Sequence, residues 1–108
     1  MASNSDVKLL YVTAGSPEEA ENIATELVSR KLVACANILG PATSIYWSEG
    51  KVTTEQETVF IVKTKARLVE QTIAKILELH SYDCPAVVAL DVEEGNPKFL
   101  KWINENTI

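Results

Sequence analysis

The side chain in this sequence best suited to proton transfer or metal binding is its single histidine, His80. Imidazole changes charge near neutral pH, and its ring nitrogens are common metal ligands. His80 follows an apolar helical pattern and precedes Ser81-Tyr82-Asp83. A histidine is also favoured at the end of a helix by the helix dipole. This structural role is the favoured interpretation, because one histidine supplies too few ligands for a tight metal site.

The two cysteines are far apart in the sequence and form no C-x-x-C motif, which excludes zinc-knuckle and thioredoxin-like sites. Cys35 lies between two alanines in an apolar, β-rich segment, where a cysteine commonly acts as a small buried hydrophobic residue. A soft ligand for a thiophilic cation such as copper(I) is the alternative, and it needs partners from elsewhere in the fold. Cys84 precedes Pro85 and is expected in an exposed loop.

Two charged residues and two aromatic residues mark a possible interface or ligand cleft. Glu57 and Lys63 fall on alternate positions of one β-rich segment, so they share a face of the strand. If this face lies at a subunit interface, Glu57 and Lys63 are candidates for a buried ion pair. If it faces water, they are ordinary surface charges. Tyr46 and Trp47 are large aromatics near a predicted turn, and covering them by an interface or a ligand avoids costly exposure.

Motifs typical of enzymes and of phosphate-binding proteins are absent from the sequence. It contains no G-x-S-x-G and no second histidine, and its four glycines form no phosphate-binding loop. It also lacks the aromatic motifs of RNA-recognition domains. These observations indicate a protein that is not an enzyme.

A very long β-hairpin is the element that would position these residues. Its predicted arms, Val33–Trp47 and Val52–Lys63, flank the turn Ser48-Glu49-Gly50-Lys51. Each arm would extend roughly 40 Å at ~3.3 Å per residue. Gly40-Pro41 predicts a bulge or bend in the first arm. Because so long a ribbon overhangs a small domain and leaves unpaired edges, the chain is expected to assemble with copies of itself.

The rest of the chain alternates strands and helices. A strand at Val7–Ala14 comes first, and a helix capped by Ser16 and ending at Arg30-Lys31 follows it. After the hairpin come a helix at Ala66–Leu79, a strand at Ala86–Val92 and a final helix opened by Gly95-Asn96-Pro97. The apolar face of this last helix consists of Phe99, Leu100, Trp102 and Ile103. This predicts an α+β, ferredoxin-like βαββαβ sandwich with a long hairpin between its second and third strands and an extra C-terminal helix. Residues 1–6 are expected to be a disordered leader, and residues 7–108 a single domain.

Composition narrows the partners and the compartment. The net charge of -5 and the scattered basic residues argue against nucleic acid as a partner. No apolar run approaches the ~20 residues of a membrane span. Two cysteines and no signal peptide indicate a reducing, cytoplasmic setting by default, with organellar targeting as the alternative if a transit peptide has been removed.

Five sequence segments together resemble the CutA divalent-cation tolerance family. In chain order these are Leu32–Ile38 (family pattern LxACxNI), Ser44–Trp47 with Glu49-Gly50-Lys51 (SIYxWxGK), Glu57 with Lys63-Thr64 (E…KT), His80–Asp83 (HPYE) and Gly95-Asn96 with Phe99–Trp102 (GNxxYLxW). The matches cover nearly the whole chain in order, so the chain is identified as a member of this family.

The resemblance implies a homotrimer with interlocked hairpins, similar in subunit architecture to the nitrogen-regulatory PII proteins. It also implies a role in tolerance of copper and other divalent cations, with weak cation binding, no required cofactor and no catalysis. The ligand cleft implied by the matched positions comprises Tyr46, Glu57, Lys63, His80, Tyr82 and Asp83. Our leading hypothesis is that the cleft carboxylates bind the cation together with His80 and Cys35 as candidate metal ligands.

Departures from the family pattern bear on the metal site. Ser81 replaces the usual proline, and Asp83 replaces the usual glutamate, which shortens the reach of that carboxylate. Some bacterial members carry an additional cysteine and a second histidine where this chain has Val12-Thr13 and Leu79. If those residues hold copper in other members, only His80 is left here to do so.

Two alternative functions remain open from the sequence. One is a PII-like sensor or signalling scaffold, in which an anionic or amphiphilic ligand is held between subunits by Lys63, Tyr46 and Tyr82. The other is a structural assembly module whose cleft residues stabilise the trimer. The sequence identifies no physiological protein partner.

Overall fold

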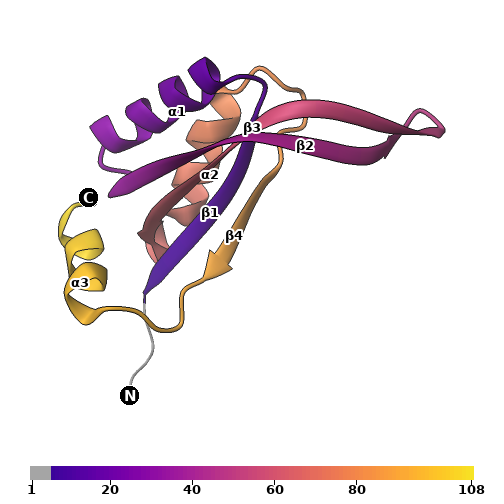
Figure 1. The fold of residues 1–108 in the computed structure, drawn as a ribbon. Helices are drawn as coiled ribbons and strands as arrows, with labels where there is room; N and C mark the ends of the chain where they lie inside the picture. The colour runs from indigo at the N-terminus through magenta and orange to yellow at the C-terminus, as the bar shows by residue number, and fades with distance from the viewer. Residues whose placement is uncertain (1–5) are drawn as a thin grey trace.

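A four-stranded antiparallel sheet organises the protein, for which a computed structural model describes residues 6–108 (Figure 1). Its strands are β1 (Val7–Ala14), β2 (Cys35–Ser48), β3 (Lys51–Lys65) and β4 (Val87–Asp91), in the spatial order β2-β3-β1-β4. Helices α1 (Pro17–Ser29) and α2 (Val69–Leu79) cover one face, and α3 (Pro97–Glu105) follows β4. This confirms the predicted βαββαβ order with its terminal helix.

The core lies between the sheet and the helices α1 and α2. Alternate residues of the two central strands point toward the helices, because successive side chains of a strand face opposite sides of the sheet. The largest side chains with almost no exposure in this layer are Leu10 and Val12 of β1, Phe60 and Val62 of β3, Ile23 and Leu27 of α1 and Ile76 of α2. On the opposite face, α3 packs at one end of the sheet, where Ile103 joins Val7 in a small cluster and Lys65 Nζ donates to the Asn104 carbonyl at 3.2 Å.

Helix α1 begins as its sequence predicts and ends slightly earlier. The Ser16 side chain accepts a hydrogen bond from the Glu19 N–H at 3.1 Å, and Pro17 occupies the first turn. The helix ends at Ser29, because Lys31 turns to a positive φ of 58° and leaves Arg30 as the cap.

The second predicted helix, Ala66–Leu79, is divided at its start. Ala66–Leu68 form a 3-10 turn, and α2 proper begins at Val69. No side chain caps this start, and the Ala66 N–H instead donates to the Asp6 carbonyl at 2.7 Å. Asp6, which the sequence interpretation assigns to the leader, thus contacts the domain. The rest of that leader, residues 1–5, lies outside the described residues.

The hairpin projects well beyond the helices and accounts for the 47 Å length of the molecule (Figure 1). Its turn consists of Glu49 and Gly50, which both have positive φ (50° and 78°), as a type I′ turn requires. The pairing of β2 with β3 shifts between Ile38 and Gly40, and Gly40 has a φ of 104°. The bulge predicted at Gly40-Pro41 is therefore confirmed.

Helix α3 packs against the rest of the protein through only part of its apolar face. Asn96 caps it by accepting the Lys98 N–H at 3.0 Å, as expected. Of the four residues predicted to form this apolar face, Ile103 is buried and Leu100 is partly buried. Phe99 and Trp102 stack on each other with ring centroids 5.9 Å apart and remain 40% and 41% exposed. A short helix presents too narrow a face to bury all four side chains against one small sheet.

Within residues 6–108, no helix combines the length and the apolar character needed to cross a membrane.

Candidate functional site

A pocket of about 480 Å³ lies where the hairpin leaves the body of the sheet. Its walls come from β1, both arms of the hairpin and the segment that connects α2 to β4. The lining residues are Thr13, Tyr46, Glu55, Glu57, Tyr82, Asp83, Cys84 and Ala86. We call this the acidic pocket, because three carboxylates and no basic side chain line it.

The hairpin contributes one wall through side chains on a single face. Glu55 and Glu57 alternate along β3, and Tyr46 lies opposite Thr53 on the adjacent strand. The Tyr46 hydroxyl donates to Glu55 Oε1 at 2.6 Å. This hydrogen bond raises the pKa of Tyr46, since the neutral phenol is the donor. Glu55 was not among the residues predicted from the sequence.

Tyr82 closes the opposite side of the pocket and contacts the hairpin. Its hydroxyl donates to Glu57 Oε2 at 2.9 Å, and its ring lies against His80 with centroids 4.7 Å apart. Burial, and then the hydrogen bond to Glu57, raise the pKa of Tyr82 to about 12. The phenol is therefore a neutral donor that orients the Glu57 carboxylate.

His80 lies behind Tyr82 with its side chain fully buried. Its Nδ1 accepts the Tyr82 N–H at 3.2 Å, and this assigns the proton to Nε2, which lies 2.7 Å from the Thr13 carbonyl. Both ring nitrogens thus have protein partners. His80 also caps the end of α2, which is the structural position that the sequence favoured. Its role as a metal ligand stays a prediction and would require it to give up one of these contacts.

Glu19 joins this network, although it was not among the site residues predicted from the sequence. Its Oε1 accepts the Gly15 N–H at 3.0 Å, and its Oε2 accepts the Ser81 N–H at 2.8 Å. Oε2 also lies 3.6 Å from His80 Nδ1. Desolvation opposes ionisation of Glu19, but the hydrogen bonds from Gly15 and Ser81 outweigh it, so its pKa lies below the ordinary value.

Of the six predicted cleft residues, Lys63 alone lies far from the others. Its Nζ donates to Asn37 and lies 6.0 Å from the centroid of the Phe99 ring. It lies six residue steps along the strand from Glu57, about 20 Å at the usual rise. Tyr46, Glu57, Tyr82 and Asp83 do line one pocket, with His80 directly behind it.

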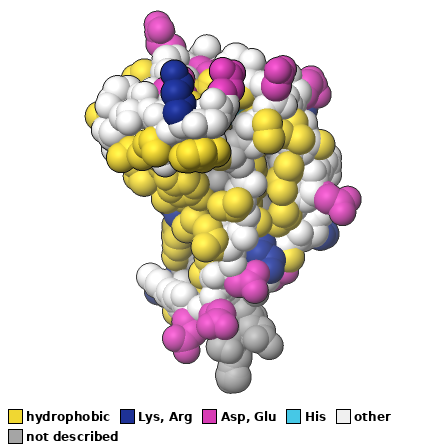
Figure 2. Space-filling view, turned by 90° about the vertical axis from the view of Figure 1, so that its right-hand side faces the viewer, with side chains coloured by type: hydrophobic (Ala, Val, Ile, Leu, Met, Phe, Trp, Pro, Cys, Tyr) yellow, Lys and Arg dark blue, Asp and Glu magenta, His cyan; other side chains and the backbone are white. Residues whose placement is uncertain are grey.

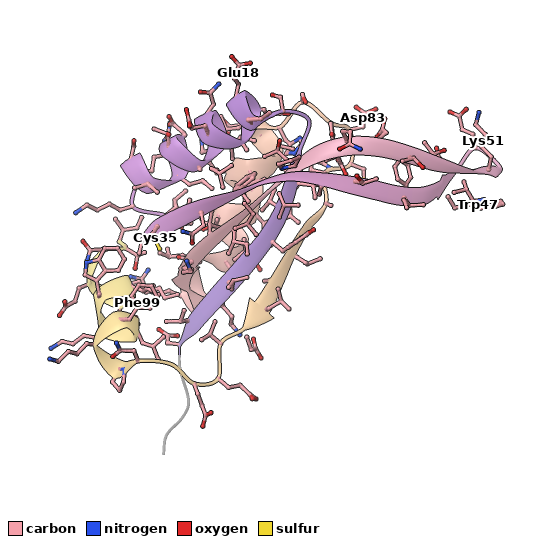
Figure 3. The ribbon with its side chains drawn as sticks, in the orientation of Figure 1. Glu18, Cys35, Trp47, Lys51, Asp83 and Phe99 are labelled. Carbon is pink, nitrogen blue, oxygen red and sulfur yellow. The ribbon has the colours of Figure 1, made fainter. Side chains whose placement is uncertain are left out.

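The two predicted metal ligands do not meet within one chain. Cys35 is paired with Lys63, which is paired in turn with Leu9, whereas His80 bonds to Thr13. The two sites are therefore offset by four residue steps along β1, about 13 Å in the strand direction. Figure 3 shows Cys35 near α3, at the opposite end of the sheet from Asp83. Among the described residues, no three His, Cys, Asp or Glu side chains are grouped so that they could hold a metal ion.

Cys35 is half-buried, and Cys84 is exposed as predicted. The position of Cys84 on the acidic pocket was not foreseen, since neither local pattern nor spacing links it to the hairpin.

Comparisons with known proteins identify the class and then the family. The "CutA1 divalent ion tolerance protein" family matches residues 8–106. The divalent-cation tolerance protein CutA of Archaeoglobus fulgidus is 42% identical over 96 residues, covering 89% of this chain and 93% of the relative. These matches place the chain in a class of divalent-ion tolerance proteins rather than in a class of enzymes. The chain belongs to the CutA1 family, as its sequence resemblance predicts.

Solved structures share the fold over almost the full chain. The CutA1 structure from Oryza sativa matches with a TM-score of 0.94 at 36% identity, covering 99% of this chain and 98% of that one. The Thermus thermophilus protein matches with a TM-score of 0.91 at 38% identity, covering 94% of this chain and 99% of that one. The ferredoxin-like arrangement with its long hairpin is thus the family fold.

Relatives differ in length and in compartment. The chain spans 56% of the chloroplastic CutA 1 of Oryza sativa, to which it is 38% identical over 99 residues. The Archaeoglobus fulgidus structure is described as periplasmic. Family membership therefore leaves the compartment of this chain open, and the cytoplasmic default stays a prediction.

Proposed function

We propose that this chain acts as a homotrimer in divalent-cation tolerance and that the acidic pocket binds copper or another divalent cation weakly. The observation that carries the proposal is the gathering of Glu55, Glu57 and Asp83 around one pocket in a member of a divalent-ion tolerance family. Carboxylate oxygens are ligands for divalent cations, and a thiol such as Cys84 favours copper or zinc over harder ions.

Weak binding follows from the geometry of one chain. Two of the three carboxylates already accept a tyrosine hydroxyl, Glu55 from Tyr46 and Glu57 from Tyr82. Because the donors within residues 6–108 do not converge into a closed site, a cation there retains water ligands or takes additional ligands from a second subunit. Either arrangement gives an open, exchangeable site rather than a structural metal centre.

Trimer assembly is supported by apolar surface that a single chain leaves uncovered. On the projecting hairpin, Ile45, Trp47 and Val52 are the most exposed large apolar side chains, and Trp47 is 71% exposed. Tyr11, Val88 and Leu90 are exposed on the sheet. Figure 2 shows hydrophobic side chains along the hairpin and continuing over the surface below it. Apolar surface of this extent is typical of a face that meets another protein.

Calorimetry with Cu²⁺ and with Zn²⁺ on the assembled protein tests the binding site. A Glu57→Gln, Asp83→Asn variant removes two pocket charges with little change of shape, and we expect about a tenfold or greater loss of affinity. The matched control is Glu93→Gln, Glu94→Gln, which removes two exposed charges outside the pocket. Equal affinities for the two variants would contradict the assignment. If Cys35→Ser were the only variant to lose binding, the metal site would instead be assigned to the end of the sheet where Cys35 lies.

The two alternatives predict different results. An anionic ligand needs a positive partner, but Lys63 lies about 20 Å away along the strand, so within one chain the acidic pocket repels anions. A purely structural module predicts that Glu57→Gln lowers trimer stability and that the wild type binds neither metal. Sedimentation velocity on the same variants separates this outcome from the binding proposal.

A further inference from the structure

We propose that Glu19 is the positioning residue of the acidic pocket. Its carboxylate forms a hydrogen-bonded bridge between the turn that joins β1 to α1 and residues 81–84, and this bridge holds Tyr82 against Glu57. The inference deepens the proposed function, and only its effect on cation binding rests on that function.

The first step is the bridge that Glu19 makes between two loops. One oxygen accepts the Gly15 N–H at 3.0 Å and the other accepts the Ser81 N–H at 2.8 Å. Hydrogen bonds from backbone N–H groups to a carboxylate are about twice as strong as neutral ones. The Glu19 side chain is only 18% exposed, so water competes little for these contacts. The two loops are therefore joined by a single charged side chain.

The second step connects this bridge to Tyr82. Residues 80–82 are held by the Ser81 bond to Glu19, by the Tyr82 N–H bond to His80 Nδ1, and by His80 Nε2 on the Thr13 carbonyl. A Cβ placed on Gly15 would lie 3.4 Å from both Glu19 Oε1 and the Tyr82 hydroxyl. Gly15, Glu19 and Tyr82 thus form one tight cluster, and Tyr82 extends from it to Glu57.

The third step is that the bridge depends on one backbone donor and one carboxylate. Proline carries no N–H to donate, so a proline at position 81 would remove the donor. Here Ser81 supplies that donor, and Glu19 is in place to accept it. Glu18, the preceding residue, is exposed and points away from the body of the molecule (Figure 3), so it is a matched control with the same charge.

The experiment uses the assembled full chain without metal and compares wild type with Glu19→Ala, Glu19→Gln and Glu18→Ala. Amide hydrogen exchange is followed at Ser81 and Tyr82, and the ring proton shifts of Tyr82 report its contact with His80. We expect Glu19→Ala to speed exchange at both amides about tenfold or more and to move the Tyr82 ring signals. Glu19→Gln keeps one acceptor oxygen and should be intermediate, and Glu18→Ala should match wild type.

A second variant separates the hydrogen bond from general stability. Ser81→Pro deletes the N–H donor and leaves the Glu19 carboxylate in place. In the Ser81→Pro background, Glu19→Ala should change the amide exchange and ring proton shifts of Tyr82 much less than in wild type, because coupled contacts are not additive. Equal effects of Glu19→Ala in the two backgrounds, or unchanged Tyr82 signals in Glu19→Ala, would overturn the proposal.

Copper titration of the same proteins distinguishes this inference from the proposed function. If wild type binds Cu²⁺, Glu19→Ala should weaken binding and Glu18→Ala should not. If Glu19→Ala alters Tyr82 but wild type binds no Cu²⁺, the positioning role stands and the proposed function falls. If wild type binds Cu²⁺ and Glu19→Ala changes neither Tyr82 nor affinity, the positioning role falls alone.

Discussion

The two halves of β3 lie in different environments, although they belong to one continuous strand. In residues 58–65, Phe60, Val62 and Thr64 are completely buried beneath the helices, and β1 pairs along the other edge. In residues 51–57 the strand pairs with β2 alone, and most of its side chains are exposed. Glu57, which accepts from Tyr82, lies at the junction of the two halves.

This difference indicates two sources of stability in one hairpin. The inner half is stabilised by burial of apolar area in the core. The outer half has a ladder, a turn and a few side-chain contacts such as Gln56 with Thr43 at 3.0 Å, and an isolated two-stranded ribbon is marginal in water. The outer half thus has few stabilising contacts within this chain, whereas the inner half has many.

The largest expected effect is on the inner half. Phe60→Ala removes a fully buried ring and should lower the free energy of unfolding by about 3–5 kcal/mol. Val52→Ala, on the exposed outer half, should change protomer stability by only about 0.5 kcal/mol. Urea unfolding of both variants, under conditions where the protomers are dissociated, provides the measurement. Similar losses for both would remove the distinction between the halves.

The next effect concerns assembly through the outer half. Trp47→Ala should weaken the proposed trimer by about 2 kcal/mol, the size typical of a central aromatic at an interface. The fold of the protomer should persist, because Trp47 lies outside the buried core clusters and is largely exposed. Sedimentation equilibrium and circular dichroism report the two properties separately. A variant that stays trimeric at all concentrations would place the interface elsewhere.

A smaller effect is expected at the turn. Gly50 has a φ of 78°, and a side chain in this conformation costs about 1 kcal/mol. Gly50→Ala should therefore loosen residues 45–54 without altering the inner half. Amide exchange resolved along β3 measures this directly, and Ser48→Ala is the neighbouring control. Faster exchange spread evenly from residue 51 to residue 65 would show that the halves act as one unit.

The junction can be tested through Tyr82. Glu57→Gln removes the carboxylate that accepts the phenol, so the pKa of Tyr82 should fall from about 12 toward its ordinary value. Ultraviolet titration of wild type and variant, with Tyr82→Phe to assign the signal, gives the readout. Because burial is the larger cause of the shift, part of it should survive. An unchanged value would mean that Glu57 does not act on Tyr82.

The smallest effect is a pH dependence at Glu19. Its pKa is lower in the folded protein than the ordinary 4.5, so it stabilises the fold above that value. This contribution is lost as the pH falls through the lower folded pKa. Wild type should therefore lose more stability than Glu19→Gln between about pH 6 and pH 3. Parallel curves for wild type, Glu19→Gln and the control Glu18→Gln would contradict the assigned shift.

Local signals in the sequence were sufficient for the elements and most of their ends. Ser16, Asn96 and Gly50 act on backbone groups within three residues of themselves, so capping and turn geometry are encoded where they occur. The 3-10 start at Ala66 was missed, because its partner is the carbonyl of Asp6 at the far end of the sequence. The alternation in β3 predicted that Glu57 and Lys63 share a face but carried no information on what that face meets.

The sequence by itself determined the order of the elements, the long hairpin with its bulge and turn, and the family, since these depend on patterns read along the chain. Only the tertiary structure decided that Tyr82 reaches Glu57, that Glu19 accepts from Ser81, and that Lys63 lies away from both. These contacts join segments remote in sequence, and their existence depends on strand register and on how α2 packs against the sheet. The residue types determine which groups are able to hydrogen-bond, but only the packing of the chain determines which of these groups come within hydrogen-bonding distance.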